Sequence, residues 1–228
     1  MGLRSLVRKT LAKNKKSPRP SLNELDKKLE KYFSFQNGFF VEAGANDGYA
    51  QSNTYYLENS LGWSGILIEG IPDLYAKCRK LRKSSSVYNC ALVSNDFGGD
   101  KVTMHYANLM SVVEGSLKTE EAQNAHIKSG LDVQRINNSY STEVPARTLT
   151  SILDQEQNLP KIDFFSLDVE GYEFDVLKGL DLTRYRPHFI LVEARFFSEV
   201  NQHLSSYNYK MLEKLSVHDY LYVDELVV

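Results

Sequence analysis

The chain has 228 residues, of which 42% are hydrophobic and 25% charged, so it can bury the core of one α/β domain and does not have the composition of a disordered protein. Its formal net charge of −2 gives no sign of nucleic-acid binding. Two cysteines are too few for a disulfide scaffold, and no apolar run approaches the roughly 20 residues that span a bilayer. Because we also see no secretory signal, we expect a cytoplasmic protein.

Residues 1–20 are predicted to form a basic N-terminal tail. This segment carries seven lysine and arginine residues and no acidic one. Four aliphatic side chains recur beside these cations at helical spacing, as they would in a short helix that lies on an anionic membrane surface. Four such side chains bury little area, so we prefer a solvated tail and keep peripheral membrane contact as the alternative.

A helical lead-in is predicted over residues 21–36. Ser21 and Glu24 have the spacing of a capping box, in which the first side chain caps the helix. Leu25 and Leu29 then follow on one helical face, which predicts a helix over Leu22–Phe33.

From residue 39 onwards, strand and helix patterns alternate. The predicted strands are Phe39–Ala43, Gly65–Glu69, Ser86–Val93, Lys101–Tyr106, Ile162–Val169, His188–Glu193 and Tyr220–Val228. The predicted helices are Ser52–Leu61, Asp73–Arg82, Thr148–Gln155, Tyr172–Leu180 and Tyr207–Leu215. Residues 107–140 are polar and weakly patterned, as in a lid or insertion over a site. The alternation predicts a single domain over residues 21–228 with a Rossmann-like, doubly wound, mainly parallel sheet and helices on both faces.

The loop after the first predicted strand carries the strongest local signal. It contains Gly44, Asn46, Asp47 and Gly48, and Glu42 lies near the strand end. Glycine lets a backbone approach a ligand closely, and open α/β sheets bind ligands at the carboxyl ends of their strands. The glycine spacing is not that of a dinucleotide site, and an acidic loop suits a ligand with an ammonium and a sulfonium better than a phosphate. Taken alone, the loop fits a tight turn equally well.

The ends of the next two predicted strands extend this candidate cofactor site. Glu69 ends the second strand, where an acid accepts hydrogen bonds from both hydroxyls of a ribose, although a solvated glutamate is the alternative. Asn89 and Ala91 lie in the third strand, where an adenine would bind and backbone groups could contact its amino edge.

Three acids are candidates for catalysis. Asp168 and Glu170 follow the strand Ile162–Val169, and Glu193 ends the next core strand. Together they could supply a general base, a hydrogen bond to the substrate or oxygen ligands for Mg²⁺. For Glu170, capping of the following helix is an equal alternative. We interpret Glu173 as a solvated helix charge.

At these residues the chain resembles the FkbM-type methyltransferase family, over about residues 38–193. The matching motifs are Glu42–Gly48, Ile68–Pro72 and Ile162–Glu173 with its continuation Val176–Gly179. The resemblance implies a class I methyltransferase fold, S-adenosylmethionine as the cofactor and a hydroxyl group as the methyl acceptor, often on a sugar or polyketide. The chain departs from the family at Ser166, where members often have lysine, and its end at Val228 predicts a short or incomplete last hairpin.

The sequence therefore predicts an S-adenosylmethionine-dependent O-methyltransferase that acts on a hydroxyl of a glycan, glycolipid or related metabolite. A non-catalytic interaction protein of the same fold, at a membrane surface, is the alternative. Nucleic-acid adenine methylation is not expected, because that chemistry usually follows the fourth strand with a polar residue, two prolines and an aromatic. Here the chain reads Asp168-Val169-Glu170-Gly171.

Overall fold

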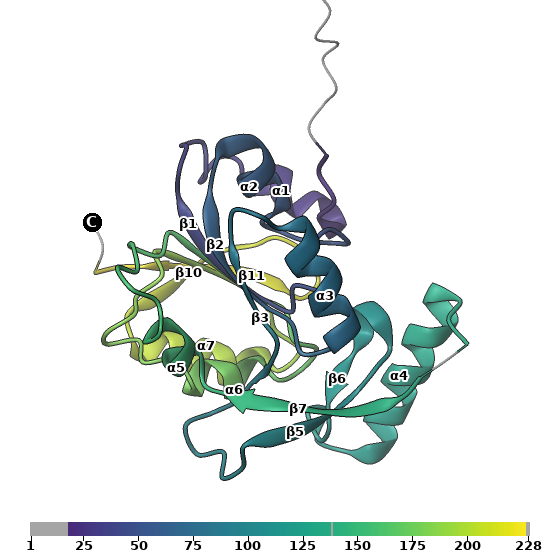
Figure 1. The fold of residues 1–228 in the computed structure, drawn as a ribbon. Coiled ribbons are helices and arrows are strands. Elements are labelled where there is room, and N and C mark those ends of the chain that lie inside the picture. Colours follow the sequence, from purple (N-terminus) through teal and green to yellow (C-terminus); the bar gives the residue numbers. More distant parts are fainter. Residues whose placement is uncertain (1–17, 138, 227–228) are drawn as a thin grey trace, which may run out of the picture.

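The computed structural model describes residues 18–137 and 139–226, so nearly all of the basic tail, with its predicted membrane contact, lies outside the described residues. A seven-stranded sheet in the order β10-β11-β9-β8-β1-β2-β3 forms the centre of the fold (Figure 1). Its strands are β1 (Phe39–Ala43), β2 (Ser64–Ile68), β3 (Ser86–Tyr88), β8 (Phe164–Leu167), β9 (Phe189–Glu193), β10 (Tyr209–Lys214) and β11 (Asp219–Asp224). Neighbouring strands are parallel except where β11 pairs with β9 and with β10.

Helices cover both faces of this sheet, which confirms the predicted doubly wound α/β fold. The short η1 (Leu22–Glu24), α1 (Leu25–Lys28), α2 (Tyr55–Leu61) and α3 (Pro72–Leu81) lie on one side, and α5 (Leu149–Leu153), α6 (Glu173–Lys178) and α7 (Phe197–Ser206) lie on the other (Figure 1). Successive strand residues alternate between two separate cores, with Phe40 and Phe164 in one and Val41 and Phe165 in the other. The core strands are apolar on both faces for this reason.

A second, smaller sheet lies beside the carboxyl end of the main sheet (Figure 1). Its order is β4-β7-β5-β6, with β4 (Ala91–Leu92), β5 (Lys101–His105), β6 (Val112–Val113) and β7 (Ser141–Arg147). The polar segment 107–140 includes η2 (Asn108–Met110), β6 and the long helix α4 (Glu120–Gln134). An apolar cluster that includes Ile71, Leu74 and Met104 packs this sheet onto the main fold.

The lead-in is less helical than predicted. Asn23 and Glu24 have positive φ angles of 52° and 57°, which confine the regular helix to α1. The predicted capping box is wrong, because the Ser21 hydroxyl donates to Asn53 Oδ1 at 2.5 Å rather than capping the helix. Ser21 also forms a bridge with Gln51, so the lead-in is attached to the loop after β1.

The C-terminal region also differs from the prediction. The expected helix Tyr207–Leu215 is wrong, because α7 ends at Ser206 and Asn208 adopts a positive φ of 64° that redirects the chain into β10. The strands β10 and β11, of six residues each, form a paired antiparallel hairpin, so of the expected short or incomplete hairpin the second alternative is wrong. The predicted third strand is interrupted and divides into β3 and β4, which belong to different sheets. In the described part of the chain, no helix is long and apolar enough to cross a membrane.

Candidate active site

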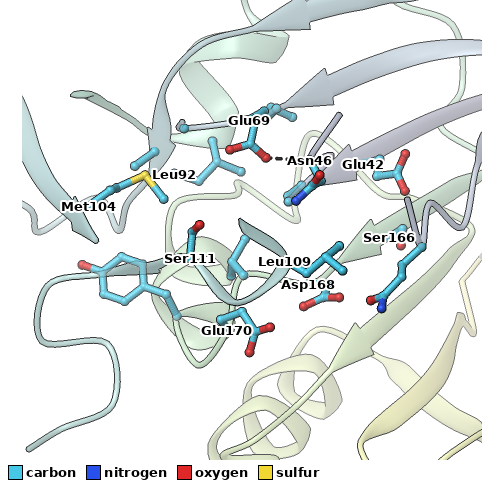
Figure 2. Close-up of a pocket in the computed structure, with 18 of the residues that line it drawn as sticks. Glu42, Asn46, Glu69, Leu92, Met104, Leu109, Ser111, Ser166, Asp168 and Glu170 are labelled. Atoms are coloured by element: carbon cyan, nitrogen blue, oxygen red, sulfur yellow. Dashed lines mark hydrogen bonds between the residues drawn. The ribbon is translucent and has the colours of Figure 1, made fainter. Parts of the chain in front are cut away.

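A cavity opens at the carboxyl ends of β1, β2 and β8, and its empty space is about 880 Å³ including the part open to solvent. Clefts of this size hold small-molecule ligands. One end is lined by apolar side chains: Ile68, Ala91, Leu92, Met104 and Val113. The other end is polar, with Glu42, Gln51, Ser52, Asn53 and Ser166. Figure 2 shows Leu92 and Met104 on one side, Glu42 and Ser166 on the other, and Glu69 and Asp168 on opposite walls between them.

The register of the sheet aligns the predicted site residues. Ala43 pairs with Ile68 on one side and with Leu167 on the other, and Leu167 pairs with Val192. The residues that follow these four are Gly44, Glu69, Asp168 and Glu193. The sheet therefore places one predicted site residue at the end of each of four neighbouring strands, as expected for a ligand site of an open α/β sheet.

Gly44 occupies a position that only glycine fits. Its φ is +84°, and a Cβ atom built there would lie 1.8 Å from the Asp168 carbonyl oxygen. The loops after β1 and β8 are thus in direct backbone contact at the floor of the cavity. Gly48, with φ +83°, has a different role, because its missing Cβ leaves room for Arg82 and Cys78 rather than for a ligand.

Glu69 is buried rather than solvated, with 6% of its surface exposed. One carboxylate oxygen accepts the backbone N–H of Asn46 and the other that of Ile71, both at 2.7 Å. Burial raises the pKa of Glu69 to about 7. A carboxylate offers about four acceptor positions, so two remain for a ligand on the cavity wall.

Glu42 lines the cavity, but its carboxylate is already engaged. It accepts hydrogen bonds from the Ser52 and Thr54 hydroxyls and from the Asn53 backbone N–H. Arg82 lies 3.4 Å away as its ion-pair partner. Glu42 therefore organises the turn that lines the polar end of the cavity, and its expected contact with a ligand ammonium stays a prediction.

Arg82 is a residue supporting the site that sequence reasoning missed. Its side chain is 1% exposed and donates to Glu58 at 2.7 Å, to the Gly48 carbonyl at 3.2 Å and to the Thr54 hydroxyl at 2.7 Å. These partners lie 24 to 34 residues away in the chain. Arg82 ends the predicted helix Asp73–Arg82, and no local pattern in the sequence indicates its partners.

The remaining predicted cofactor residues divide into two groups. Asn46 and Ala91 line the cavity. Gly48, Asp47 and Asn89 lie outside its lining, and their expected contact with the ligand stays a prediction. Asp47 accepts the backbone N–H groups of two following residues, and the Asn89 amide donates to the carbonyls of Glu69 and Gly70, each at 2.8 Å. Both side chains hold the loops that carry the lining residues.

Asp168 and Glu193 form an acid pair at the ends of β8 and β9. Asp168 lines the cavity, whereas Glu193 lies behind it, outside the lining. The negative charge of Glu193 lies close enough to act on the Asp168 carboxyl group. Burial raises the pKa of Asp168 well above its usual value, and the charges of Glu193 and Glu170 raise it further. Such a group keeps its proton to a higher pH than an ordinary aspartate does.

Glu170 lines the cavity in a strained backbone conformation, with φ 55°. Arg195 donates to its carboxylate at 2.5 Å, and His126 of α4 lies 3.4 Å from the same oxygen. Burial raises the pKa of Glu170 against the opposing effect of Arg195. Because Arg195 follows β9 and His126 belongs to the insertion, Glu170 joins three parts of the chain.

Glu170 pairs with Arg195 rather than capping α6, and the interpretation of Glu173 as a solvated charge is wrong. Glu173 is only 1% exposed and accepts the backbone N–H groups of Val169 at 3.3 Å and Gly171 at 2.8 Å. Burial raises its pKa to about 7. Glu173 thereby fixes the loop that presents Asp168 and Glu170.

The insertion covers the site, which confirms the prediction of a lid or insertion in this segment. Asn108, Leu109 and Ser111 line the cavity from η2 and the turn after it. Their contribution could not be assigned in advance, because the segment lacks a clear hydrophobic period. Ser166, at the position where family members often have lysine, is buried and accepts a hydrogen bond from Asn53 Nδ2 at 3.0 Å.

No group of three or more His, Cys, Asp or Glu side chains within residues 18–137 and 139–226 is arranged to hold a metal ion. The possibility that Asp168, Glu170 and Glu193 hold Mg²⁺ therefore gains no support. Glu170 is instead paired with Arg195, and the charge of Glu193 raises the pKa of Asp168.

Comparisons with known proteins address the family. Similar folds include the precorrin-6y C5,15-methyltransferase of Geobacter metallireducens, at 10% identity over 87% of this chain and 86% of that one, with a TM-score of 0.43. A human methyltransferase 10 domain containing protein matches at 10% identity over 87% and 80% of the two chains, with a TM-score of 0.45. No protein with a curated description matches significantly. The sequence profile of the methyltransferase FkbM domain matches residues 42–222, so the chain belongs to the FkbM methyltransferase family.

Proposed function

We propose that this protein is an S-adenosylmethionine-dependent O-methyltransferase whose acceptor is a hydroxyl of a glycan, glycolipid or related metabolite. The observation that carries the proposal is the arrangement of apolar, acidic and polar side chains along one cavity. Its apolar end, a buried carboxylate at Glu69, its polar end and an acid at Asp168 occur together at the edge of a parallel sheet.

This arrangement of side chains matches the parts of the methyl donor: an adenine, a ribose and an amino acid tail. The apolar side chains around Leu92 and Met104 would enclose the adenine. The two free acceptor positions of Glu69 would take the ribose hydroxyls. The polar end, where Asn53 and Ser166 lie, would bind the amino acid tail. The donor supplies an electrophilic methyl group on a positively charged sulfur.

The residues of the chain would supply alignment and proton transfer. Methyl transfer is an in-line displacement, in which the acceptor oxygen forms a bond to the methyl carbon while the carbon–sulfur bond breaks and its electron pair stays on sulfur. The acceptor proton needs a base, and Asp168 is the acid that lines the cavity beside the contact between the two loops. Glu193 and Glu170 would keep its proton affinity high enough for this task.

Two further observations concern the setting. Cys78 and Cys90 are both buried and free, which supports the proposed cytoplasmic location. No contact among the described residues favours the alternative of a non-catalytic membrane protein, and a cavity with Asp168 in its lining favours an enzyme.

The test is a comparison of wild type with Asp168→Asn in transfer of labelled methyl groups from S-adenosylmethionine to a panel of neutral glycosides. We expect turnover to fall roughly 10²–10⁴-fold, the usual contribution of a positioned base. Affinity for the donor, measured by calorimetry, should change far less. The control is Asp175→Asn, which removes a half-exposed acid that pairs with Lys178 outside the cavity.

The pH profile gives a second readout. Because the pKa of Asp168 is raised, wild-type turnover should rise as the pH increases and the carboxyl group loses its proton. The groups that face it are Glu193, Glu170 and Glu173, with Arg195 pairing Glu170. Asp168→Asn should lose this limb of the profile. A fully active Asp168→Asn enzyme, or no binding of the donor at millimolar concentration, would refute the proposal.

A further inference from the structure

The cavity has an unbalanced charge. Four carboxylates line it, at Glu42, Glu69, Asp168 and Glu170, and none of the described residues in its lining is Lys, Arg or His. Such an arrangement in a partly buried cleft produces a negative potential, because the low-dielectric walls limit screening by water.

Only part of this charge is compensated from behind the lining. Arg82 pairs with Glu42, and Arg195 pairs with Glu170. Within residues 18–137 and 139–226, Glu69 and Asp168 have no ion-pair partner, and Asp168 has Glu193 as an acidic neighbour. The two acids without a compensating cation therefore lie on the walls that face each other in Figure 2, and a cation bound between them would favour their ionised forms.

The place of the donor sulfur follows from the same geometry. In S-adenosylmethionine the sulfur is bonded to C5′ of the ribose, so a sugar held at Glu69 would bring the sulfur toward the space between Glu69 and Asp168. Gly44 forms the floor there, and its contact with the Asp168 carbonyl keeps that loop close. A sulfonium in this space meets opposite charge, whereas the thioether left after transfer carries no charge at sulfur.

We propose that this site distinguishes the methyl donor from its own demethylated product by charge, with Asp168 as the residue that makes the distinction. The inference rests on the proposed function, because it assumes that the donor binds in this cavity. It goes further in predicting that the product is bound weakly and released readily. Glu69 contacts the sugar that both ligands share, so its hydrogen bonds contribute to both affinities, whereas Asp168 faces the atom that differs.

The experiment measures the affinity of the full chain for three ligands by calorimetry. The ligands are S-adenosylmethionine, S-adenosylhomocysteine and sinefungin, which carries a protonated amine in the region of the methylated sulfur. We expect the two cationic ligands to bind on the order of tenfold more tightly than S-adenosylhomocysteine, and the ratio to shrink with added salt. In Asp168→Asn the ratio should approach one, with little change in affinity for S-adenosylhomocysteine.

The matched control is Asp175→Asn, which removes the same charge a short distance along the chain, outside the cavity lining, and should keep the wild-type ratio. Equal wild-type affinities for the three ligands would overturn the inference while leaving the proposed function intact. So would a ratio that survives in Asp168→Asn. Failure of all three ligands to bind would overturn the proposed function and the inference together.

Discussion

The loops that follow β1 and β8 line the same cavity and touch each other at Gly44, but they are stabilised in opposite ways. In the loop after β1, each buried charge has an opposite charge or several donors as partners. Glu42 accepts four different donors, and Arg82 bridges Glu42 and Glu58 while also bonding the loop backbone. Satisfied networks of this kind rigidify a structure.

The loop after β8 instead contains neighbouring acids of like charge and a strained backbone conformation. Asp168 faces Glu193, and Glu170 holds a positive φ beside Arg195 and His126. Three buried atoms around this loop lack hydrogen-bond partners among the described residues: Ser116 Oγ, His126 Nε2 and Arg195 Nε. Like charges and unpartnered polar atoms are costly in a folded protein and occur preferentially at functional sites.

The difference indicates a division of labour within one cavity. The β1 loop is organised before any ligand arrives, as expected where a constant donor binds. The β8 loop and its surroundings contain polar groups that are only partly hydrogen-bonded, as expected where the reacting groups meet. Changes in the two loops should therefore affect different properties, with stability most sensitive in the first and proton-linked behaviour most sensitive in the second.

The largest expected effect on stability comes from Arg82→Met. Removing the guanidinium leaves Glu42 and Glu58 buried without their partner, and breaking a buried pair in this way costs about 3–5 kcal/mol. Urea unfolding followed by circular dichroism would measure the loss. Arg79→Met is the control, because Arg79 is exposed on α3, the helix that Arg82 follows, and its side chain donates to the Tyr75 hydroxyl at 3.4 Å.

A double variant, Arg82→Met with Glu58→Gln, sharpens the test. Neutralising Glu58 should recover part of the lost stability, because it removes one of the two buried carboxylates left without an ion-pair partner. A loss in Arg82→Met no larger than that in Arg79→Met would mean that the β1 loop does not depend on this network.

The next effect concerns Glu173 and the dependence of stability on pH. Burial raises its pKa to about 7 in the folded protein from 4.5 for the free side chain, so the folded state binds the proton more tightly than the unfolded chain. The free energy of unfolding should then fall as the pH rises from 4.5 to 7, by up to about 3 kcal/mol from this group. Glu173→Gln should remove that contribution and flatten the profile.

Unfolding measured at pH 5, 6.5 and 8 would show the change in slope. Glu69 also has a raised pKa, so the slope should decrease in Glu173→Gln without vanishing. Glu199→Gln serves as the control, since Glu199 pairs with Lys118 at the surface. Parallel profiles for wild type and Glu173→Gln would contradict the assignment of a buried, proton-binding carboxyl group.

Features that depend on local sequence could be predicted from the sequence, whereas features that depend on contacts between distant residues could not. The buried strands β1, β2, β8 and β9 are continuous apolar runs between loops, so their existence and order followed from local pattern. Strand register then brought Gly44, Glu69 and Asp168 together, as the strand-end rule predicts. These features depend only on residues close in sequence and on the handedness of the crossovers.

The remaining features depend on contacts between distant residues. The edge strand β10 is mostly exposed and carries no clear alternation, so its pattern resembled a helix until the pairing with β11 decided it. The two-residue strands β4 and β6 exist only through their partners in the second sheet. Glu173 was misinterpreted because its burial results from accepting two loop N–H groups, which composition does not reveal.

The smallest expected effect, and the most specific one, is on ribose recognition by Glu69. In Glu69→Gln two charge-assisted hydrogen bonds become neutral ones, which should weaken donor binding by about 1–2 kcal/mol in total, or roughly 5- to 30-fold. Because Glu69 also holds Asn46 and Ile71 through their backbone N–H groups, the glutamine keeps one acceptor oxygen and disturbs the loop less than alanine would.

A paired ligand separates recognition of the sugar from support of the loop. Affinities of wild type and Glu69→Gln for 5′-methylthioadenosine and its 2′,3′-dideoxy analogue form a thermodynamic cycle. If Glu69 binds the hydroxyls, their removal should weaken binding to wild type much more than to Glu69→Gln. Equal losses in the two proteins would limit Glu69 to holding the β1 loop, and the ribose would then have to be bound by another group on the cavity wall.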